Sequence, residues 1–128
     1  MSAYARGSCL CGAVAFEAAG DPLWVVHCHC RSCRRQTASA VATFAGFRRE
    51  QVTFTQAERA LFTSSPGVRR GFCARCGTPI SYEADRFEGE IHLYVVSFDD
   101  PTRFVPQHHV NFDEHVSWLR VDEHLPAR

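Results

Sequence analysis

Just past its midpoint the chain reads FCARCGT at residues 72–78, where two cysteines are separated by two residues and followed by a glycine. This is the form of a zinc knuckle, a tight turn that aims two thiolates at one metal ion and backbone amides at the sulfurs. A second pair lies in SCLCG at residues 8–12, and it too is followed by a glycine. Because a structural zinc ion takes four tetrahedral ligands, we expect the two turns to share one closed site. Its ligands are then Cys9, Cys11, Cys73 and Cys76.

The other three cysteines lie close together, in the stretch HCHCRSC at residues 27–33. Three thiolates can hold a metal ion and leave its fourth position open, as catalytic zinc sites do. At such a position zinc can bind an incoming thiol as thiolate at neutral pH, or polarise a small carbonyl oxygen. The alternative is a closed structural site in which His27 or His29 is the fourth ligand. The sequence thus predicts two zinc ions per chain, the second held by Cys28, Cys30 and Cys33.

The overall composition is that of a globular domain with no strongly charged partner. The chain has 128 residues, 45% of them hydrophobic and 22% charged, which fits a single zinc-binding domain over residues 1–128. Its formal net charge is zero, which argues against binding to nucleic acid or anionic lipid. No apolar run has the length of a signal peptide or a membrane span. We therefore expect a cytoplasmic protein, with no nucleic acid or membrane partner, whose cysteines bind metal rather than form disulfides.

Most of the chain outside the cysteine clusters has the alternation or the β-branched enrichment of strands. Strands are predicted at residues 13–17, 23–27, 40–44, 51–55, 60–63, 68–72, 80–83 and 91–98. A short helix is predicted over residues 30–37, and Asp99-Asp100-Pro101-Thr102 is expected to cap a single helical turn. Ser65-Pro66-Gly67 is typical of a hairpin turn. The expected fold class is therefore mainly β, with one or two short helices, and zinc fastens its distant strands.

The histidines outside the cysteine clusters are less informative. His108 and His109 are adjacent, so in a strand one of them would lie on each face of the sheet, and His109 is a candidate site residue. His92 lies in a strand-like run opposite its apolar neighbours, where alternation favours a solvent-facing position. His115 and His124 are expected at the surface.

Taken together, the cysteine stretches resemble a known family. They are GSCLCGAV at residues 7–14, HCHCRSCRR at residues 27–35 and GFCARCGTP at residues 71–79. In order and spacing they resemble the glutathione-dependent formaldehyde-activating enzyme family, also called the centromere protein V type domain, over about residues 7–126. The resemblance implies a fold of several coiled antiparallel β-sheets, shared with a zinc-containing Rab GTPase chaperone. It also implies two zinc sites whose ligands match the partition above.

The activity implied by the resemblance joins glutathione to formaldehyde as S-(hydroxymethyl)glutathione, and it is classed by its reverse direction as a carbon-sulfur lyase. The expected partner is then a small thiol such as glutathione. Arg34 and Arg35 follow the open site in the sequence. They are expected to bind the carboxylates of glutathione, since guanidinium pairs with carboxylate bidentately. His109, His27 or His29 is expected to transfer the proton that the thiol releases. The alternative is a non-enzymatic zinc module that sequesters a thiol or binds a partner protein.

Overall fold

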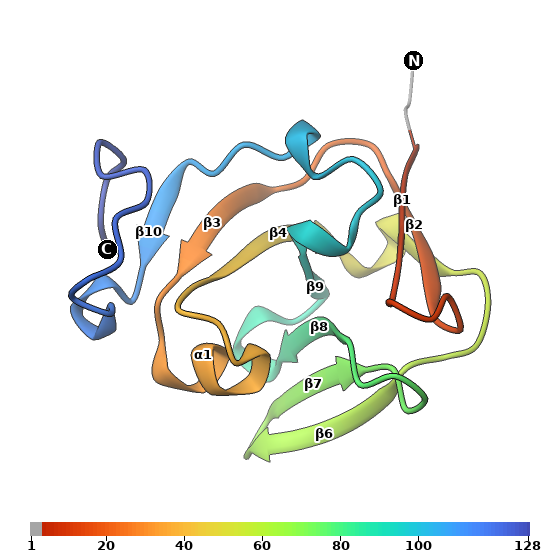
Figure 1. Cartoon of the computed structure of the whole chain (residues 1–128). Coiled ribbons are helices and arrows are strands. Elements are labelled where there is room, and N and C mark those ends of the chain that lie inside the picture. Colours follow the sequence, from red (N-terminus) through yellow and green to blue (C-terminus); the bar gives the residue numbers. More distant parts are fainter. Residues whose placement is uncertain (1–3) are drawn as a thin grey trace.

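The computed structural model describes residues 4–128 and is mainly β, as the sequence predicts (Figure 1). The strands are β1 (Tyr4–Ser8), β2 (Ala15–Ala19), β3 (Trp24–Cys28), β4 (Ala42–Arg48), β5 (Val52–Phe54), β6 (Ala60–Ser65), β7 (Val68–Phe72), β8 (Pro79–Ala84), β9 (Glu90–Tyr94) and β10 (His108–Val110). They form a three-stranded sheet in the order β1-β2-β5 and a seven-stranded sheet in the order β10-β3-β4-β9-β8-β7-β6. All neighbours pair antiparallel except β10, which runs parallel to β3.

In the described residues, α1 (Arg31–Thr37) is the α-helix, and it begins where the sequence predicts a short helix. The thiol of Cys30 caps it by accepting a hydrogen bond from the amide of Cys33. The predicted single turn is also present as a 3-10 turn at Pro101–Arg103, with proline in its first position and Asp100 as its cap. Further 3-10 turns lie at Arg49–Gln51, Asp85–Phe87, Val95–Ser97 and Phe112–Glu114. Within residues 4–128 no helix has the length and apolarity needed to cross a membrane.

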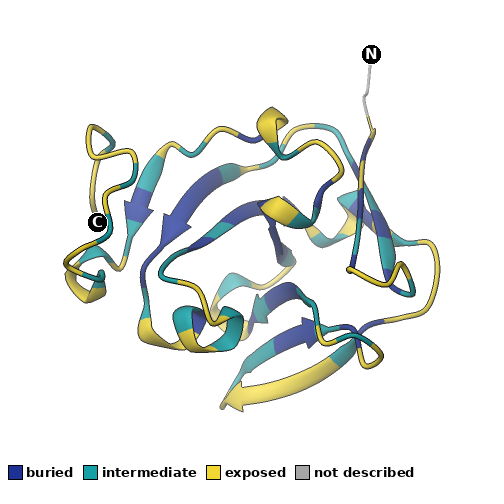
Figure 2. Cartoon of the chain, viewed as in Figure 1, coloured by how far each residue is buried: buried dark blue, intermediate teal, exposed yellow. Residues whose placement is uncertain are grey.

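Local sequence accounts for the β6-β7 hairpin. The two strands meet at Pro66 and Gly67, and Gly67 has a φ of 75°. Proline presets the backbone of the first central turn position, and glycine accepts the positive φ of the second without steric penalty. β6 forms one edge of the large sheet and is mostly exposed (Figure 2).

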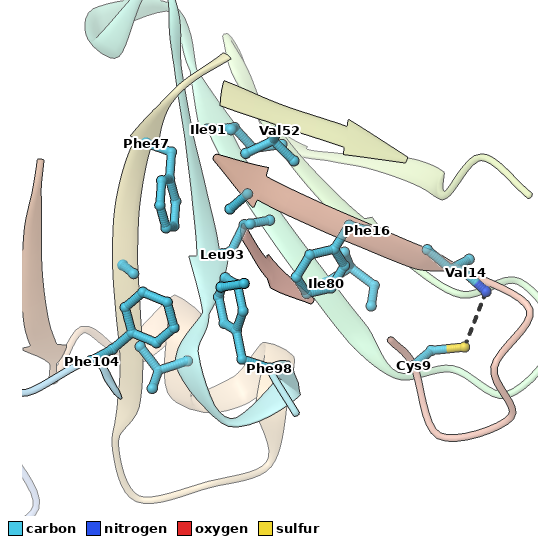
Figure 3. Close-up of a cluster of buried hydrophobic side chains, with 14 of the residues drawn as sticks. Cys9, Val14, Phe16, Phe47, Val52, Ile80, Ile91, Leu93, Phe98 and Phe104 are labelled. Atoms are coloured by element: carbon cyan, nitrogen blue, oxygen red, sulfur yellow. Dashed lines mark hydrogen bonds between the residues drawn. The ribbon is translucent and has the colours of Figure 1, made fainter. Parts of the chain in front are cut away.

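The two faces of the large sheet bury different sets of side chains. Consecutive residues of a strand point to opposite faces, so Val25 enters the main core while its neighbour Val26 joins a second cluster. The main core contains Phe16, Phe47 and Ile80, each at most 1% exposed (Figure 3). The members of the second cluster include Cys28, Cys33, Phe44, Tyr82 and Tyr94. Three cysteines of the candidate open site are therefore built on the face opposite the main core.

The C-terminal segment folds back along β10 (Figure 1). The amide of His109 donates to the carbonyl of Pro126 at 2.8 Å, and the amide of Arg128 donates to the carbonyl of His109 at 2.8 Å. The carboxylate of Asp122 accepts a hydrogen bond from His27 Nε2 at 2.7 Å. This segment thus covers one edge of the large sheet.

Close backbone approach at Gly7 yields a test of the packing between β1 and the main core. A Cβ at this position would lie 2.4 Å from the carbonyl oxygen of Ser97 and 2.5 Å from the ring of Phe16. We expect Gly7→Ala to lower the free energy of unfolding by about 1–3 kcal/mol, because backbone atoms must shift to admit the methyl group. Urea denaturation of the metal-loaded protein measures this. Arg6→Ala, at an exposed position of the same strand, is the control and should stay within about 0.5 kcal/mol of the parent protein. Equal effects of the two substitutions would contradict the packing described here.

Candidate metal centres and the adjoining cavity

The first cysteine cluster consists of Cys9, Cys11, Cys73 and Cys76. All of its sulfurs lie within 4.8 Å of one another. The Cys9 and Cys11 sulfurs are 3.6 Å apart, and those of Cys11 and Cys73 are 3.8 Å apart. A tetrahedral ion with metal–sulfur bonds of about 2.3 Å places its sulfurs about 3.8 Å apart, whereas a disulfide needs about 2.05 Å. The donor set therefore fits one four-coordinate zinc ion, and all four cysteines are free thiols.

Two turns from different sheets build this cluster. Cys9 and Cys11 lie between β1 and β2 of the small sheet, and Cys73 and Cys76 lie between β7 and β8 of the large one. The glycines that follow each pair have φ values of 82° at Gly12 and 83° at Gly77, a backbone conformation that favours glycine. The cluster thus joins the two sheets at one point.

Backbone amides and one hydroxyl point at the sulfurs, as thiolate ligands require. The amide of Val14 donates to Cys9 Sγ at 3.3 Å (Figure 3). The amide of Cys76 donates to Cys73 Sγ at 3.4 Å. The hydroxyl of Thr78 lies 3.1 Å from Cys76 Sγ, and this hydrogen bond lowers the pKa of Cys76 to about 5. These contacts stabilise negative charge on sulfur before any metal binds.

The second cluster consists of Cys28, Cys30 and Cys33, gathered from the end of β3 and the start of α1. The sulfurs of Cys28 and Cys33 are 3.7 Å apart, again close to the edge of a zinc–sulfur tetrahedron. Hydrogen bonds from Cys28 and Cys33 hold the pKa of Cys30 far below its usual value. Hydrogen bonds with Cys28 and Cys30 raise the pKa of Cys33. One negative charge is therefore favoured in the free cluster, and a bound cation would be needed to keep all three as thiolates.

No histidine of residues 4–128 joins the second cluster. His27 uses Nδ1 on Thr43 at 2.8 Å and Nε2 on Asp122 at 2.7 Å. His29 Nε2 lies 2.8 Å from His109 Nδ1. The geometry therefore favours the open three-thiolate arrangement over the closed site with a histidine as its fourth ligand.

His109 lies on the opposite face of the sheet from the second cluster, which argues against the catalytic role expected for it. Its Nε2 lies 2.8 Å from the carbonyl of Asp122, so this nitrogen must carry the hydrogen, and Nδ1 accepts from His29. His109 is 2% exposed, and it anchors the C-terminal segment together with His27. Alternation along β3 and β10 explains this, because Cys28 and His27 point to opposite faces.

A cavity of about 880 Å³ opens beside the second cluster, and Cys28, Cys30 and Cys33 all line it. Its wall combines aromatic rings with charged groups. The aromatic members are Trp24, Phe44, Tyr82 and Phe87, and the charged members are Arg70, Arg86, Arg128 and Glu114. The volume and mixed lining are those of sites that bind small molecules.

The structure differs from two expectations about which side chains lie beside the second cluster. His92 is not solvent-facing: it is 5% exposed, forms part of the cavity wall and stacks on Tyr82. Arg34 and Arg35 do not line the cavity, and Arg34 Nε instead donates to the carbonyl of His29 at 3.1 Å. The guanidinium beside the cluster belongs to Arg70, whose Nη1 lies 3.5 Å from Cys33 Sγ. The adjacent pair Arg69-Arg70 is a local sign of a possible anion site, but only the pairing of β7 in the large sheet brings Arg70 to these sulfurs.

The remaining histidines are less central. His124 is exposed, as expected. His115 is partly buried rather than on the surface, because its ring stacks on Phe112 with centroids 4.0 Å apart.

This fold and these two thiol clusters define a mainly β protein with one closed and one open candidate metal centre. The family model described as glutathione-dependent formaldehyde-activating enzyme matches residues 4–114, so the chain belongs to that family. Among solved structures, a crystal structure of a Rhodobacter sphaeroides protein is similar, with a TM-score of 0.63 and 22% sequence identity. The match covers 77% of this chain and 93% of that one, and it supports the fold. None of the curated proteins matches the chain.

The two clusters should differ in what they do for stability. The sulfurs of Cys11 and Cys73 meet across 62 sequence positions, whereas those of Cys28 and Cys33 meet across 5. Closing the longer loop restricts the unfolded chain far more. We expect Cys73→Ser to cost about 3 kcal/mol or more of unfolding free energy, or to abolish folding, and Cys30→Ser to cost about 1 kcal/mol or less. Circular dichroism during thermal unfolding compares them, and equal losses in the two variants would refute the division into structural and open sites.

The same division predicts two classes of metal release. We expect the purified protein to carry two zinc ions per chain by elemental analysis, because both donor sets fit zinc. A colorimetric chelator should remove one ion quickly with the fold intact, since three ligands hold metal less firmly than four, and the second ion only as the protein unfolds. Release of both ions in a single phase would contradict an open second site. So would a parent protein that reproducibly carries one ion per chain, if Cys30→Ser carries one as well.

Proposed function

We propose that the protein is a zinc-dependent enzyme that joins a small thiol of the glutathione type to a small electrophile such as formaldehyde. This is the activity of an S-(hydroxymethyl)glutathione synthase, a carbon-sulfur lyase in the reverse direction. One observation carries the proposal: three cysteines whose sulfur spacing fits zinc all line a ligand-sized cavity. Membership of the family supports the choice of glutathione and formaldehyde.

The proposed chemistry divides between the metal and the chain. A zinc ion bound by Cys28, Cys30 and Cys33 would supply a Lewis acid that keeps an incoming thiol deprotonated at neutral pH. The cavity walls confine thiol and aldehyde together, which raises their effective concentration. The thiol sulfur forms a bond to the aldehyde carbon, the carbonyl π electrons move to oxygen, and that oxygen takes up the proton released by the thiol. His92, His108 and Glu114 of the cavity wall are the candidates to transfer this proton.

Several further assignments belong to the same proposal. The seven cysteines hold two zinc ions per chain, in one domain over residues 1–128. Free thiols at metal-binding spacing suit the reducing cytoplasm. Among the arginines, Arg86 and Arg128 of the cavity wall are better placed to bind the substrate carboxylates than Arg34 and Arg35.

A second candidate function is thiol sequestration without catalysis. The side chains in hydrogen-bond contact with the cluster from outside it are donors only: Arg70 on Cys33 and Asn111 Nδ2 on Cys28 at 3.6 Å. Among the described residues no general base touches these sulfurs. A site that only binds a thiol needs no such base, so this observation suits sequestration as well as catalysis.

Cobalt in place of zinc tests the proposed function, because thiolate-to-cobalt charge-transfer bands report on the sulfurs around the ion. Adding glutathione should change these bands in the parent protein and leave them unchanged in Cys30→Ser, which lacks one ligand of the open site. Exchange NMR with formaldehyde then asks whether the hydroxymethyl adduct forms faster than in buffer. Binding without acceleration would favour the sequestering function, and bands that respond to no small thiol would exclude both.

A further inference from the structure

A buried guanidinium lies between the three-cysteine cluster and the cavity. Arg70 is 5% exposed, and its Nη1 lies 3.5 Å from Cys33 Sγ. It also lines the cavity. Its Nε donates to the hydroxyl of Ser64 at 3.1 Å, and the guanidinium carbon lies 5.0 Å from the centroid of the Tyr82 ring. The cation is therefore fixed from several sides and faces both the sulfurs and the space that a ligand would occupy.

Arg70 has no carboxylate partner in the described part of the chain. The other buried arginine, Arg59, is 9% exposed and pairs with both Glu58 and Glu83. A buried cation without a counter-charge is strongly unfavourable, so its compensating charge must come from another group. The Cys33 sulfur is in contact with the guanidinium and can carry negative charge.

A second buried polar group lies at the same place. The hydroxyl of Tyr94 is buried and makes no hydrogen bond within residues 4–128. Tyr94 belongs to the same buried cluster as Cys28 and Cys33, and Arg70 is among its charged neighbours. Buried polar groups without partners are rare in proteins and often mark places where an absent ion or ligand binds.

The charge of the loaded site explains what Arg70 would do. One zinc ion with three thiolates carries a net charge of minus one, and a thiolate in the fourth position makes it minus two. In a poorly solvated pocket the second negative charge is strongly disfavoured unless a cation lies close by. A neutral ligand such as water needs no such compensation.

We propose that Arg70 is the positioning residue that makes the open position of the three-cysteine site selective for anionic ligands, thiolates first among them. The proposal rests on the proposed function in that the ligand is a thiol. It differs in content, because it assigns the selectivity to one cation on β7 rather than to the metal ligands or to Arg34 and Arg35. Removing the cation should weaken binding of an anion while both metal ions stay bound.

The test uses cobalt-loaded full-length protein and four variants. Arg70→Met removes the charge at similar length, Arg70→Gln removes it but keeps a hydrogen-bond donor, and Arg70→Lys keeps it. Arg69→Met is the matched control, since Arg69 is the preceding residue on β7 and pairs with the exposed Asp85 at 3.0 Å. Each protein is titrated with glutathione, with 2-mercaptoethanol, which has no carboxylate, and with azide, while metal content and thermal midpoint are recorded.

We expect Arg70→Met and Arg70→Gln to raise the Kd for glutathione, for 2-mercaptoethanol and for azide by about tenfold or more, which is 1.4 kcal/mol. Arg70→Lys and Arg69→Met should stay within about threefold of the parent protein. Metal content should remain two ions per chain in every variant.

Other outcomes separate this inference from the proposed function. If the parent protein binds azide but no thiol, the proposed function fails while the azide series still decides the role of Arg70. A loss confined to glutathione would make Arg70 a carboxylate anchor and overturn the proposal. So would unchanged anion binding in Arg70→Gln, loss of one metal ion in Arg70→Gln and Arg70→Met, or a parent protein whose bands respond to no anion.

Discussion

The sulfur cluster of Cys9, Cys11, Cys73 and Cys76 is the constraint on which the rest of the structure depends. It fastens the turn between β1 and β2 to the turn between β7 and β8, so it joins the small sheet to the large one. Apolar packing also holds the small sheet in place, since Phe16 of β2 meets Phe98, which follows the 3-10 turn after β9, with ring centroids 5.1 Å apart. A metal bound here would fix the position of β7 and β8, and β7 carries the cation beside the second cluster. A metal in the first cluster would thereby help to position Arg70 beside the second one.

Strand alternation separates the face of the large sheet that lines the cavity from its opposite face. On β3, Cys28 points to the cavity, whereas His27 points to the C-terminal segment and holds it through Asp122. On β7, Arg70 is buried beside the thiols, whereas Arg69 pairs with an exposed carboxylate. The residues that bear on ligand binding are therefore single members of adjacent, chemically similar pairs. A change of register by one residue would exchange them.

Features set by short-range chemistry could be predicted from the sequence. Cysteine spacing predicts both sulfur clusters, and alternation or β-branched enrichment predicts β2 to β9. The run predicted at 91–98 is strand only to Tyr94, and β1 was not predicted. The short helix after Cys30 was predicted as well. Features set by distant pairing could not. β10 is three residues long and exists because it pairs with β3, and that pairing turns His109 away from the cavity. Arg70 reaches Cys33 across 37 positions, whereas Arg34 adjoins the cluster in sequence but bonds to a backbone carbonyl.

The central claim is that three cysteines hold a zinc ion whose fourth position accepts a thiol sulfur. X-ray absorption at the zinc edge measures this directly, because sulfur neighbours are distinguished from oxygen and nitrogen by distance. One ion would be bound by four cysteines and the other by three, so the average should be about 3.5 sulfurs per zinc in the free protein. With saturating glutathione the average should rise to about 4, because its sulfur is the fourth ligand of the second ion. That increase is the predicted result. A count of 4 before glutathione is added, or one that does not change when it is, would contradict the claim.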